Sequence, residues 1–279
     1  MAHFQRLQTW RFIASSEYGG KTLQVPRPCK TDIAWQRMGF KSQLIELLRN
    51  SANVNQFVDV GANTGQTMLE VFSQNPAIEY FGFEPNPQAF SCLQQLALTL
   101  GINANLFPWA CGTSSEPASF FASSPEDCSA TLLPQIRPDT YAKCNPISIA
   151  SYPLDISLKP HSISSCFIMK VDVEGFENEV LTGGAQVIKG KRPYILCEVL
   201  HAHRSSELGL NNSRKGLLES FLAETEYSIW QIELSPQDRN TLTGLKKISG
   251  FPKNVLWRDA PHMCDFLFAP KELAVPQFD

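Results

Sequence analysis

Two acidic side chains, Asp59 and Glu84, stand at places in the chain that suit the binding of a small ligand. Asp59 lies inside the apolar run FVDV, and the glycine turn GANTG at 61–65 follows directly. Glu84 ends the run YFGFE, 25 residues after Asp59. Backbone can approach a ligand closely at glycine, and a helix after such a turn begins with N–H groups able to bind an anion. This pattern favours a nucleotide-like ligand at the carboxyl ends of two strands.

The spacing of the glycines argues against two common phosphate-binding loops. A dinucleotide site needs G-x-G-x-x-G, but Asn63 and Gln66 stand where the second and third glycines belong. The match of the sequence to a Walker loop is equally poor. The Gly-Lys-Thr at 20–22 has Ser15 in place of the first glycine, and no strand is predicted before it.

S-adenosylmethionine fits this turn better than either nucleotide. Its ammonium needs an acid such as Asp59, and its carboxylate needs N–H donors such as those of the turn 61–65. Its two neighbouring ribose hydroxyls suit one carboxylate, for which Glu84 is placed. Alternatively, Glu84 only caps the helix predicted after Pro85-Asn86-Pro87.

A third acidic segment, IMKVDVEGFE at 168–177, could prepare a methyl acceptor. On an extended strand Lys170, Asp172 and Glu174 point the same way, and the last two fall at the carboxyl end where α/β sheets hold ligands. Methyl transfer requires an aligned nucleophile and removal of a proton, both of which a carboxylate can assist. The alternative is a structural network in which Lys170 pairs with Asp172 or Glu174.

A fourth segment, CEVLHAH at 197–203, adds Glu198, His201 and His203. Glu-x-x-His-x-His with Asp172 could bind a divalent metal, but no second cluster supports this and a metal is not expected. His201 as general base is the favoured interpretation, because the usual pKa of histidine, near 6.5, suits proton removal at neutral pH. Glu198 would orient His201 or contact the acceptor.

The elements that position these residues alternate between strand and helix. Strands are predicted at 56–60, 80–83, 103–110, 166–171 and 194–199, and helices at 67–73, 87–100, 177–188 and 213–223. This alternation predicts right-handed crossovers and a parallel sheet covered on both faces. Two further strands, 228–234 and 265–268, close the chain.

The rest of the chain divides into a lead-in and an insertion. Residues 1–50 are predicted as an irregular lead-in with a helix over 32–50, and residues 51–279 as the α/β domain. The Ser- and Pro-rich stretch of about 112–165 reads as an insertion into that domain, with short β pieces or a lid.

Three segments resemble those of FkbM-type methyltransferases, which are S-adenosylmethionine-dependent enzymes with the class I methyltransferase fold. They are FVDVGANTGQ at 57–66, FGFEPNP at 81–87 and IMKVDVEGFENEVLTGG at 168–184. The last is the most specific, because Lys-x-Asp-x-Glu-Gly-x-Glu followed by Val-Leu-x-Gly is unusual outside this family. The resemblance spans about residues 35–272.

The resemblance implies a Rossmann-like α/β fold with a mostly parallel seven-stranded sheet, helices on both faces and an antiparallel last strand. It implies S-adenosylmethionine as donor, S-adenosylhomocysteine as product and a sugar or natural-product hydroxyl as acceptor. The predicted donor-binding residues are Asp59, Gly61, Ala62, Asn63, Gly65, Glu84, Pro85, Ala110 and Asp172. The predicted catalytic residues are Asp172, Glu198 and His201. The alternatives are N- or carboxyl methylation, an NAD-dependent oxidoreductase, or a binding protein without turnover.

The composition limits which partners and which cellular compartment are expected for the protein. The chain has 24 Lys and Arg against 27 Asp and Glu, which offers no basic field for nucleic acid. It has no apolar run of 18 residues, so no membrane span is expected. Its eight cysteines never form C-x-x-C and several lie in apolar strands, which favours free thiols and a cytoplasmic location. The oligomeric state cannot be predicted.

Overall fold

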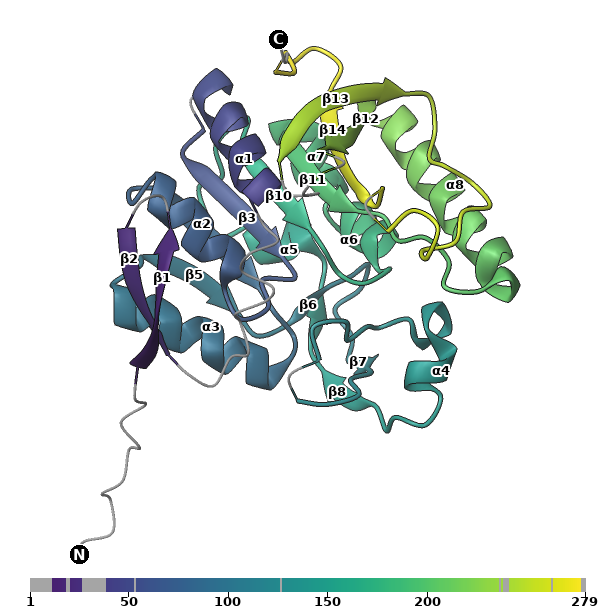
Figure 1. Ribbon diagram of the computed structural model, residues 1–279, viewed down its shortest axis with the longest axis horizontal. Coiled ribbons are helices and arrows are strands. Elements are labelled where there is room, and N and C mark those ends of the chain that lie inside the picture. The colour runs from purple at the N-terminus through teal and green to yellow at the C-terminus, as the bar shows by residue number, and fades with distance from the viewer. Residues whose placement is uncertain are drawn as a thin grey trace, which may run out of the picture.

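The computed structural model describes residues 12–18, 21–26, 39–52, 54–125, 127–235, 237, 241–261 and 263–276. A central eight-stranded sheet runs through the molecule (Figure 1). Its strand order is β13-β12-β14-β11-β10-β3-β4-β5. These strands are β3 (Gln56–Val60), β4 (Glu79–Phe83), β5 (Ala104–Phe107), β10 (Ile168–Val171), β11 (Tyr194–Glu198), β12 (Tyr227–Leu234), β13 (Leu242–Ile248) and β14 (Asp265–Pro270).

The five strands β5, β4, β3, β10 and β11 are parallel, and β14 runs antiparallel to both β11 and β12. The mostly parallel sheet with an antiparallel last strand is therefore confirmed. The prediction of seven strands missed β13, which pairs antiparallel with β12 at the edge of the sheet. β13 carries Lys246 and Lys247 beside apolar residues, so its alternation is weak, and charged side chains are common on edge strands.

Right-handed crossovers place helices on both faces of this sheet. From β3 the chain steps one way to β4 and β5, whereas from β10 it steps the other way to β11, so the connecting helices lie on opposite faces. The helices of the α/β body are α1 (Gly39–Ala52), α2 (Gln66–Gln74), α3 (Pro87–Leu100), α6 (Glu177–Gly183), α7 (Ala185–Lys191) and α8 (Leu208–Glu224). The helix predicted over 177–188 is thus two helices, which meet at Gly184.

Local signals in the sequence explain where the helices beside the site begin. α2 follows Gly65, whose φ of 99° lies in the left-handed region that glycine tolerates. α3 has Pro87 in its first turn, and the side chain of Asn86 accepts the N–H of Gln88 at 3.1 Å. Both helices therefore follow a strand end at which the sequence predicts a ligand site.

The predicted lead-in contains more structure than expected. β1 (Phe12–Tyr18) and β2 (Lys21–Pro26) pair antiparallel, whereas Gly19-Gly20 and residues 27–38, including the predicted helix start, lie outside the described part of the chain. In α1 the side chains of Leu44, Ile45 and Leu48 are buried in the same core as the central sheet. The described helix of the lead-in therefore packs into the core of the α/β domain, and the boundary at residue 50 stays a prediction.

The predicted insertion has its own small elements, of which β7, β8 and α4 lie at the lower right of Figure 1. They are β6 (Ala110–Cys111), β7 (Ala118–Phe120), the 3₁₀ helix η2 (Pro134–Ile136), α4 (Pro138–Tyr141), β8 (Ile147–Ile149), β9 (Ser151–Tyr152) and α5 (Leu154–Leu158). β7 pairs with β8, and β9 returns to the body beside β6. A second 3₁₀ helix, η3 (Ser205–Glu207), precedes α8.

Candidate active site

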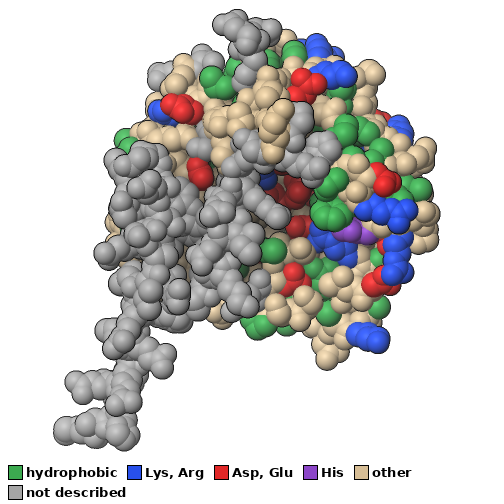
Figure 2. Space-filling view, in the orientation of Figure 1, with side chains coloured by type: hydrophobic (Ala, Val, Ile, Leu, Met, Phe, Trp, Pro, Cys, Tyr) green, Lys and Arg blue, Asp and Glu red, His purple; other side chains and the backbone are tan. Residues whose placement is uncertain are grey.

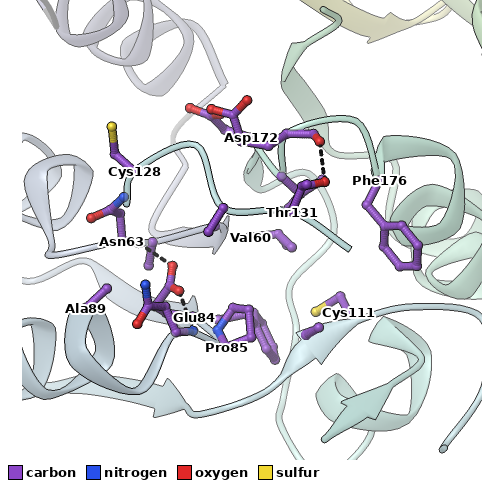
Figure 3. A pocket seen from close by; sticks show the side chains of 18 of the residues that line it. Val60, Asn63, Glu84, Pro85, Ala89, Cys111, Cys128, Thr131, Asp172 and Phe176 are labelled. Atoms are coloured by element: carbon purple, nitrogen blue, oxygen red, sulfur yellow. Dashed lines mark hydrogen bonds between the residues drawn. The ribbon is translucent and has the colours of Figure 1, made fainter. Parts of the chain in front are cut away.

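A cavity of about 210 Å³ opens at the carboxyl ends of β3, β4 and β10. Its walls come from the glycine turn, the end of β4, the loop after β10 and the insertion, with Lys41 and Glu198 at its edge. Asp172 and Thr131 lie on one side of it and Glu84 and Pro85 on the other (Figure 3). Figure 2 shows acidic side chains inside a hollow near the centre of one face, with basic side chains and a histidine beside it.

Glu84 is buried and lines this cavity. Its carboxylate accepts the backbone N–H of Asn63 at 2.8 Å and that of Asn86 at 2.7 Å (Figure 3). Burial raises the pKa of Glu84 to about 7, although these two N–H donors oppose the shift. The interpretation of Glu84 as a cap of α3 receives no support, because the cap of that helix is Asn86.

Asp59 was expected to contact the ligand, but the structure places its side chain behind the cavity wall. It is fully buried and does not line the cavity. Its carboxylate lies 3.1 Å from Nζ of Lys170 and accepts a hydrogen bond from the hydroxyl of Tyr80 at 2.5 Å. Lys170 also donates to the carbonyl oxygen of Gly61 at 3.0 Å. Asp59 therefore anchors Lys170, which in turn holds the turn that faces the cavity.

The N–H groups of the turn were expected to bind the ligand's carboxylate, but the protein itself uses them. Gly61 and Ala62 both donate to the carbonyl of Phe83, and Asn63 donates to Glu84. The other two N–H groups of the turn also have partners: that of Thr64 donates to the side chain of Asn63, and that of Gly65 donates to the carbonyl of Ala62. The next N–H groups, in the first turn of α2, belong to the cavity-lining residues Gln66 and Thr67 and have no partner within the helix.

The two glycines of the turn have different roles. Gly61 has a φ of 85°, and a side chain on it would collide with the carbonyl oxygen of Asp172. Its glycine identity therefore lets the ends of β3 and β10 approach each other at the cavity. Gly65 does not line the cavity; a side chain there would meet Leu93 and Leu96 of α3 instead.

Three carboxylates lie close together on the side of the cavity opposite Glu84. One oxygen from each of Asp172, Glu174 and Glu198 lies within 4.8 Å of the others. Burial opposes ionisation of Asp172, but the charges of Lys170 and Lys41 outweigh it and hold the pKa of Asp172 well below its usual range. Burial and the charge of Asp172 raise the pKa of Glu198 well above its usual range. Asp172 is therefore ionised at neutral pH, whereas burial and the charge of Asp172 favour the protonated form of Glu198.

The sequence provided no signal for Lys41 as a site residue. Its Nζ lies 3.2 Å from Asp265 and 3.6 Å from Asp172, and it lines the cavity. Lys41 belongs to α1, and Asp265 opens the last strand, so both are far in sequence from the segment around Asp172. Only the packing of α1 against the end of the sheet brings them together.

The described residues do not assemble the predicted alternative metal set of Glu198, His201 and His203. His203 instead accepts a hydrogen bond from Nε of Arg137, 2.9 Å from its Nε2. The cluster of Asp172, Glu174 and Glu198 could by its spacing hold a cation. However, Lys41, Lys170 and Arg137 already lie within ion-pair distance of these acids. That no metal is bound remains a prediction.

His201 was expected as general base, but the structure places its side chain away from the cavity. Its side chain is fully buried, does not line the cavity, and places Nδ1 2.9 Å from Nζ of Lys215. Lys215 is itself buried and also donates to the carbonyl of Pro252 at 2.8 Å. A histidine held in this way does not face the cavity, and its role as general base stays a prediction.

The end of the cavity beside Ala110, a predicted donor-binding residue, is apolar. Ala110, Trp109 and Phe120 line it, and Pro85 closes it beside Glu84. Trp109 is fixed by a hydrogen bond from its Nε1 to Ser157 at 3.1 Å and by packing against Phe107. The wall is therefore rigid and able to bury a flat ring.

The insertion forms part of the cavity wall, which the sequence did not reveal in detail. Asp127, Cys128 and Thr131 line the cavity from this side. The hydroxyl of Thr131 donates to the carbonyl of Glu174 at 2.8 Å, so the insertion is tied to the loop after β10.

A model of the methyltransferase FkbM domain matches residues 59–229, more than half of the chain. The chain belongs to the FkbM methyltransferase family. The three motif segments around the glycine turn, Glu84 and Asp172 lie within or across the start of the matched range. No curated protein sequence matches this FkbM-family chain.

Solved methyltransferase structures resemble this FkbM-family chain at low identity. A methyltransferase FkbM from Methylobacillus flagellatus KT is 15% identical, with a TM-score of 0.46, and the match covers 77% of this chain and 44% of that one. The chain thus spans less than half the length of that protein. The plantazolicin methyltransferase BpumL in complex with SAH is 13% identical, with a TM-score of 0.40 and 86% of each chain covered. A precorrin-6y C5,15-methyltransferase from Geobacter metallireducens GS-15 is 9% identical, with a TM-score of 0.37 and coverages of 80% and 82%.

Two site residues of this FkbM-family protein lie outside the matched range. They are Lys41 and Asp265, which flank the match on either side and meet at 3.2 Å beside Asp172. The side of the cavity at Glu84 is therefore built from the matched segment, whereas the charge of the acid cluster also depends on residues on either side of that segment.

Proposed function

We propose that the protein transfers a methyl group from S-adenosylmethionine to a hydroxyl of a small molecule, a sugar or natural product. The observation that carries this proposal is one cavity with Glu84 on one side and the carboxylates of Asp172 and Glu198 on the other. Glu84 suits binding of the donor, and the carboxylates of Asp172 and Glu198 suit binding of the acceptor. Family membership supports methyl transfer as the reaction class.

The donor would lie over the ends of β3 and β4. Glu84 would accept hydrogen bonds from the two ribose hydroxyls, because two backbone N–H groups fix its orientation. The apolar wall at Ala110 would bury the adenine. The carboxylate of the methionine end would meet the first turn of α2 at Gln66 and Thr67, where the partial positive charge of the helix favours an anion. When bound, the donor supplies a methyl group on a sulfonium.

The acceptor would bind at the acid cluster. Ionised Asp172 can accept a hydrogen bond from a hydroxyl. The raised pKa of Glu198 favours its protonated form, which can donate one, so the pair can orient an acceptor oxygen. Among the described residues no helix is long and apolar enough to cross a membrane. Seven cysteines of the described chain are free thiols, which supports our proposal of a cytoplasmic enzyme.

Donor binding can be tested with Glu84→Gln. Isothermal titration with S-adenosylhomocysteine should show at least about tenfold weaker binding, because hydrogen bonds to a charged group contribute about 1.5–3 kcal/mol. Glu79→Gln is the matched control, since Glu79 begins the same strand and lies outside the cavity. Equal affinities of Glu84→Gln and the wild type would contradict the assignment.

The reaction can be tested with donor carrying a deuterated methyl group and an extract of cells. Mass spectrometry should find one labelled small molecule, whose methyl group resists mild alkali as an ether does. A label released by alkali would indicate a carboxyl ester, and a label on nitrogen an N-methyltransferase. A thermal shift with NAD alone would favour an oxidoreductase, and donor binding without any product would favour a binding protein without turnover.

A further inference from the structure

We propose that Glu174 is the general base that removes the acceptor's proton, and that Arg137, carried by the insertion, is the residue that positions it. This inference rests on the proposed function and adds the proton acceptor to it. Glu174 lines the cavity, and one of its oxygens lies within 4.8 Å of oxygens of Asp172 and Glu198. It is therefore within reach of an acceptor that these two residues orient.

The backbone at Glu174 is held in an unfavourable conformation. Its φ of 53° lies in the left-handed region, which a residue with a side chain rarely adopts. The hydroxyl of Thr131 bonds its carbonyl at 2.8 Å, and Gly175 follows with a φ of 100° against the side chain of Ile136. Strain of this kind persists where surrounding contacts impose it, and it is common at active sites. Here the contacts at Thr131 and Ile136 come from the insertion.

The side chain of Glu174 is aimed by Arg137 from the same insertion. The guanidinium lies 2.7 Å from Oε2 of Glu174. Its Nε donates to Nε2 of His203 at 2.9 Å, and another nitrogen donates to the carbonyl of Ser129 at 3.2 Å. Arginine presents its donors in a rigid fork, so the contacts with His203 and Ser129 fix the direction in which the carboxylate is held. Both side chains are mostly buried, with 16% and 15% exposure.

Of the three clustered acids, Glu174 is best matched to proton removal at neutral pH. Asp172 is held ionised by Lys170 and Lys41 and is therefore a weak base. Burial and the charge of Asp172 raise the pKa of Glu198 well above its usual range, which favours its protonated form. Burial raises the pKa of Glu174 to about 7, with Arg137 opposing the shift. An efficient general base has a pKa close to the working pH.

Several charged or titratable groups face Glu174 from the elements around it. They are Arg137, Asp127 and Tyr141 of the insertion, Asp172 and Glu177 beside it in the chain, and Glu198 at the end of β11. Of these, Arg137 is the cation in contact with Glu174, so its removal should raise the pKa of Glu174.

The proposed step moves one proton and one methyl group. The acceptor's O–H bond breaks and its proton moves to a carboxylate oxygen of Glu174. The acceptor oxygen forms a bond to the methyl carbon while the bond from that carbon to sulfur breaks. The electron pair of the broken bond stays on sulfur, which leaves as neutral S-adenosylhomocysteine. Glu174 then returns its proton to water.

The test is the pH profile of labelled product formation at saturating donor, where the titration of Glu84 does not limit the rate. In the wild type the rate should rise as pH increases through about 7 and then level off. Glu174→Gln should lower the rate at least about a hundredfold and abolish this rise. Glu198→Gln should also lower the rate but keep the rise, which separates the base from an orienting acid.

The role of Arg137 is tested with Arg137→Met and Arg137→Lys. Arg137→Met should move the rise in rate to higher pH without weakening S-adenosylhomocysteine binding, and Arg137→Lys should restore part of the shift. Arg192→Met removes a comparable ion pair, with Glu272, away from the cavity and should leave the profile unchanged. A purely structural role of Arg137 would lower stability but leave the profile of the folded fraction in place.

A readout without an acceptor separates this inference from the proposed function. In ¹³C NMR, the carboxyl signal that disappears in Glu174→Gln should titrate near neutral pH in the wild type and at higher pH in Arg137→Met. A wild-type midpoint below about 5, or a rise in rate that survives Glu174→Gln, would overturn the inference. Failure of the wild type to methylate anything would instead overturn the proposed function, while the NMR result still decides the pairing of Glu174 with Arg137.

Discussion

The ammonium of Lys170 lies 3.1 Å from the carboxylate of Asp59, and both side chains are buried beneath the glycine turn. The side chain of Asp59 therefore does not face the cavity, and its predicted contact with the ligand stays a prediction. Burial alone would lower the pKa of Lys170, but the charges of Asp59 and Asp172 raise it above its usual range. Burial also raises the pKa of Asp59, although the charge of Lys170 opposes that shift. Lys170 fixes the carbonyl of Gly61 at the cavity wall.

Replacing Lys170 by methionine should be strongly destabilising. The change leaves the carboxylate of Asp59 buried with only the hydroxyl of Tyr80 beside it, and breaking a buried pair in this way costs about 3–5 kcal/mol. Urea unfolding measures the loss. Lys253→Met is the control, because its partner Glu219 lies on the surface and such pairs contribute about 0–1 kcal/mol. A loss below about 1 kcal/mol for Lys170→Met would show that the pair does not hold the turn.

Stability should fall as pH rises from about 4.5 to about 8. Burial raises the pKa of Glu177 from 4.5 to about 8, so in this window the folded protein keeps a proton that the unfolded chain releases. The stabilising proton is lost as pH passes the folded value. Glu177→Gln, which resembles the protonated acid, should flatten the slope of unfolding free energy against pH. The raised pKa values of Glu84 and Glu174 also make stability fall as pH rises, so Glu177→Gln should keep a smaller slope of unfolding free energy against pH.

The control for this pH dependence is Glu116→Gln, the same change on an exposed side chain, which should leave the slope as it is. Urea unfolding at pH 5, about 6.5 and 8 covers the window. A slope in Glu177→Gln equal to that of the wild type would show that Glu177 is ionised in the folded protein.

Removal of metal ions should leave the enzyme unaffected. Lys41, Lys170 and Arg137 balance the acid cluster with ion-pair distances of 3.6, 3.5 and 2.7 Å, so a divalent cation would have to displace or oppose them. Dialysis against EDTA should change neither the melting temperature nor the rate of labelled product formation. A rate that collapses in EDTA and returns with Mg²⁺ would establish a metal site at Asp172, Glu174 and Glu198.

Replacement of His201 should reduce stability and spare donor binding. In His201→Phe, Lys215 loses the ring nitrogen 2.9 Å from its ammonium, and a buried polar group without its partner costs about 1–3 kcal/mol. Unfolding by urea and titration with S-adenosylhomocysteine measure the two effects separately. Unchanged stability together with lost methyl transfer would instead return His201 to the role of base.

The residues on the side of the cavity at Glu84 were largely predictable from the sequence because their signals are local. Gly61, Asn63 and Glu84 come from one strand–turn–helix unit and the next strand end, and parallel strands bring such ends to one edge of the sheet. The direction of the side chains was not predictable in the same way. Asp59 lies inside the strand and points into the core, whereas Glu84 follows the strand end and faces the cavity.

The acceptor side depends on contacts between distant parts of the chain. Asp172 and Glu174 were recognisable from their motif, but Lys41, Thr131 and Arg137 come from α1 and the insertion, where no spacing marks them. The sequence therefore determined the alternation of strands and helices, the family and the acids at the strand ends, because these follow from local patterns. Which acid is buried, protonated or paired was decided only by the tertiary structure, since burial and the position of neighbouring charges set the pKa of each carboxyl group.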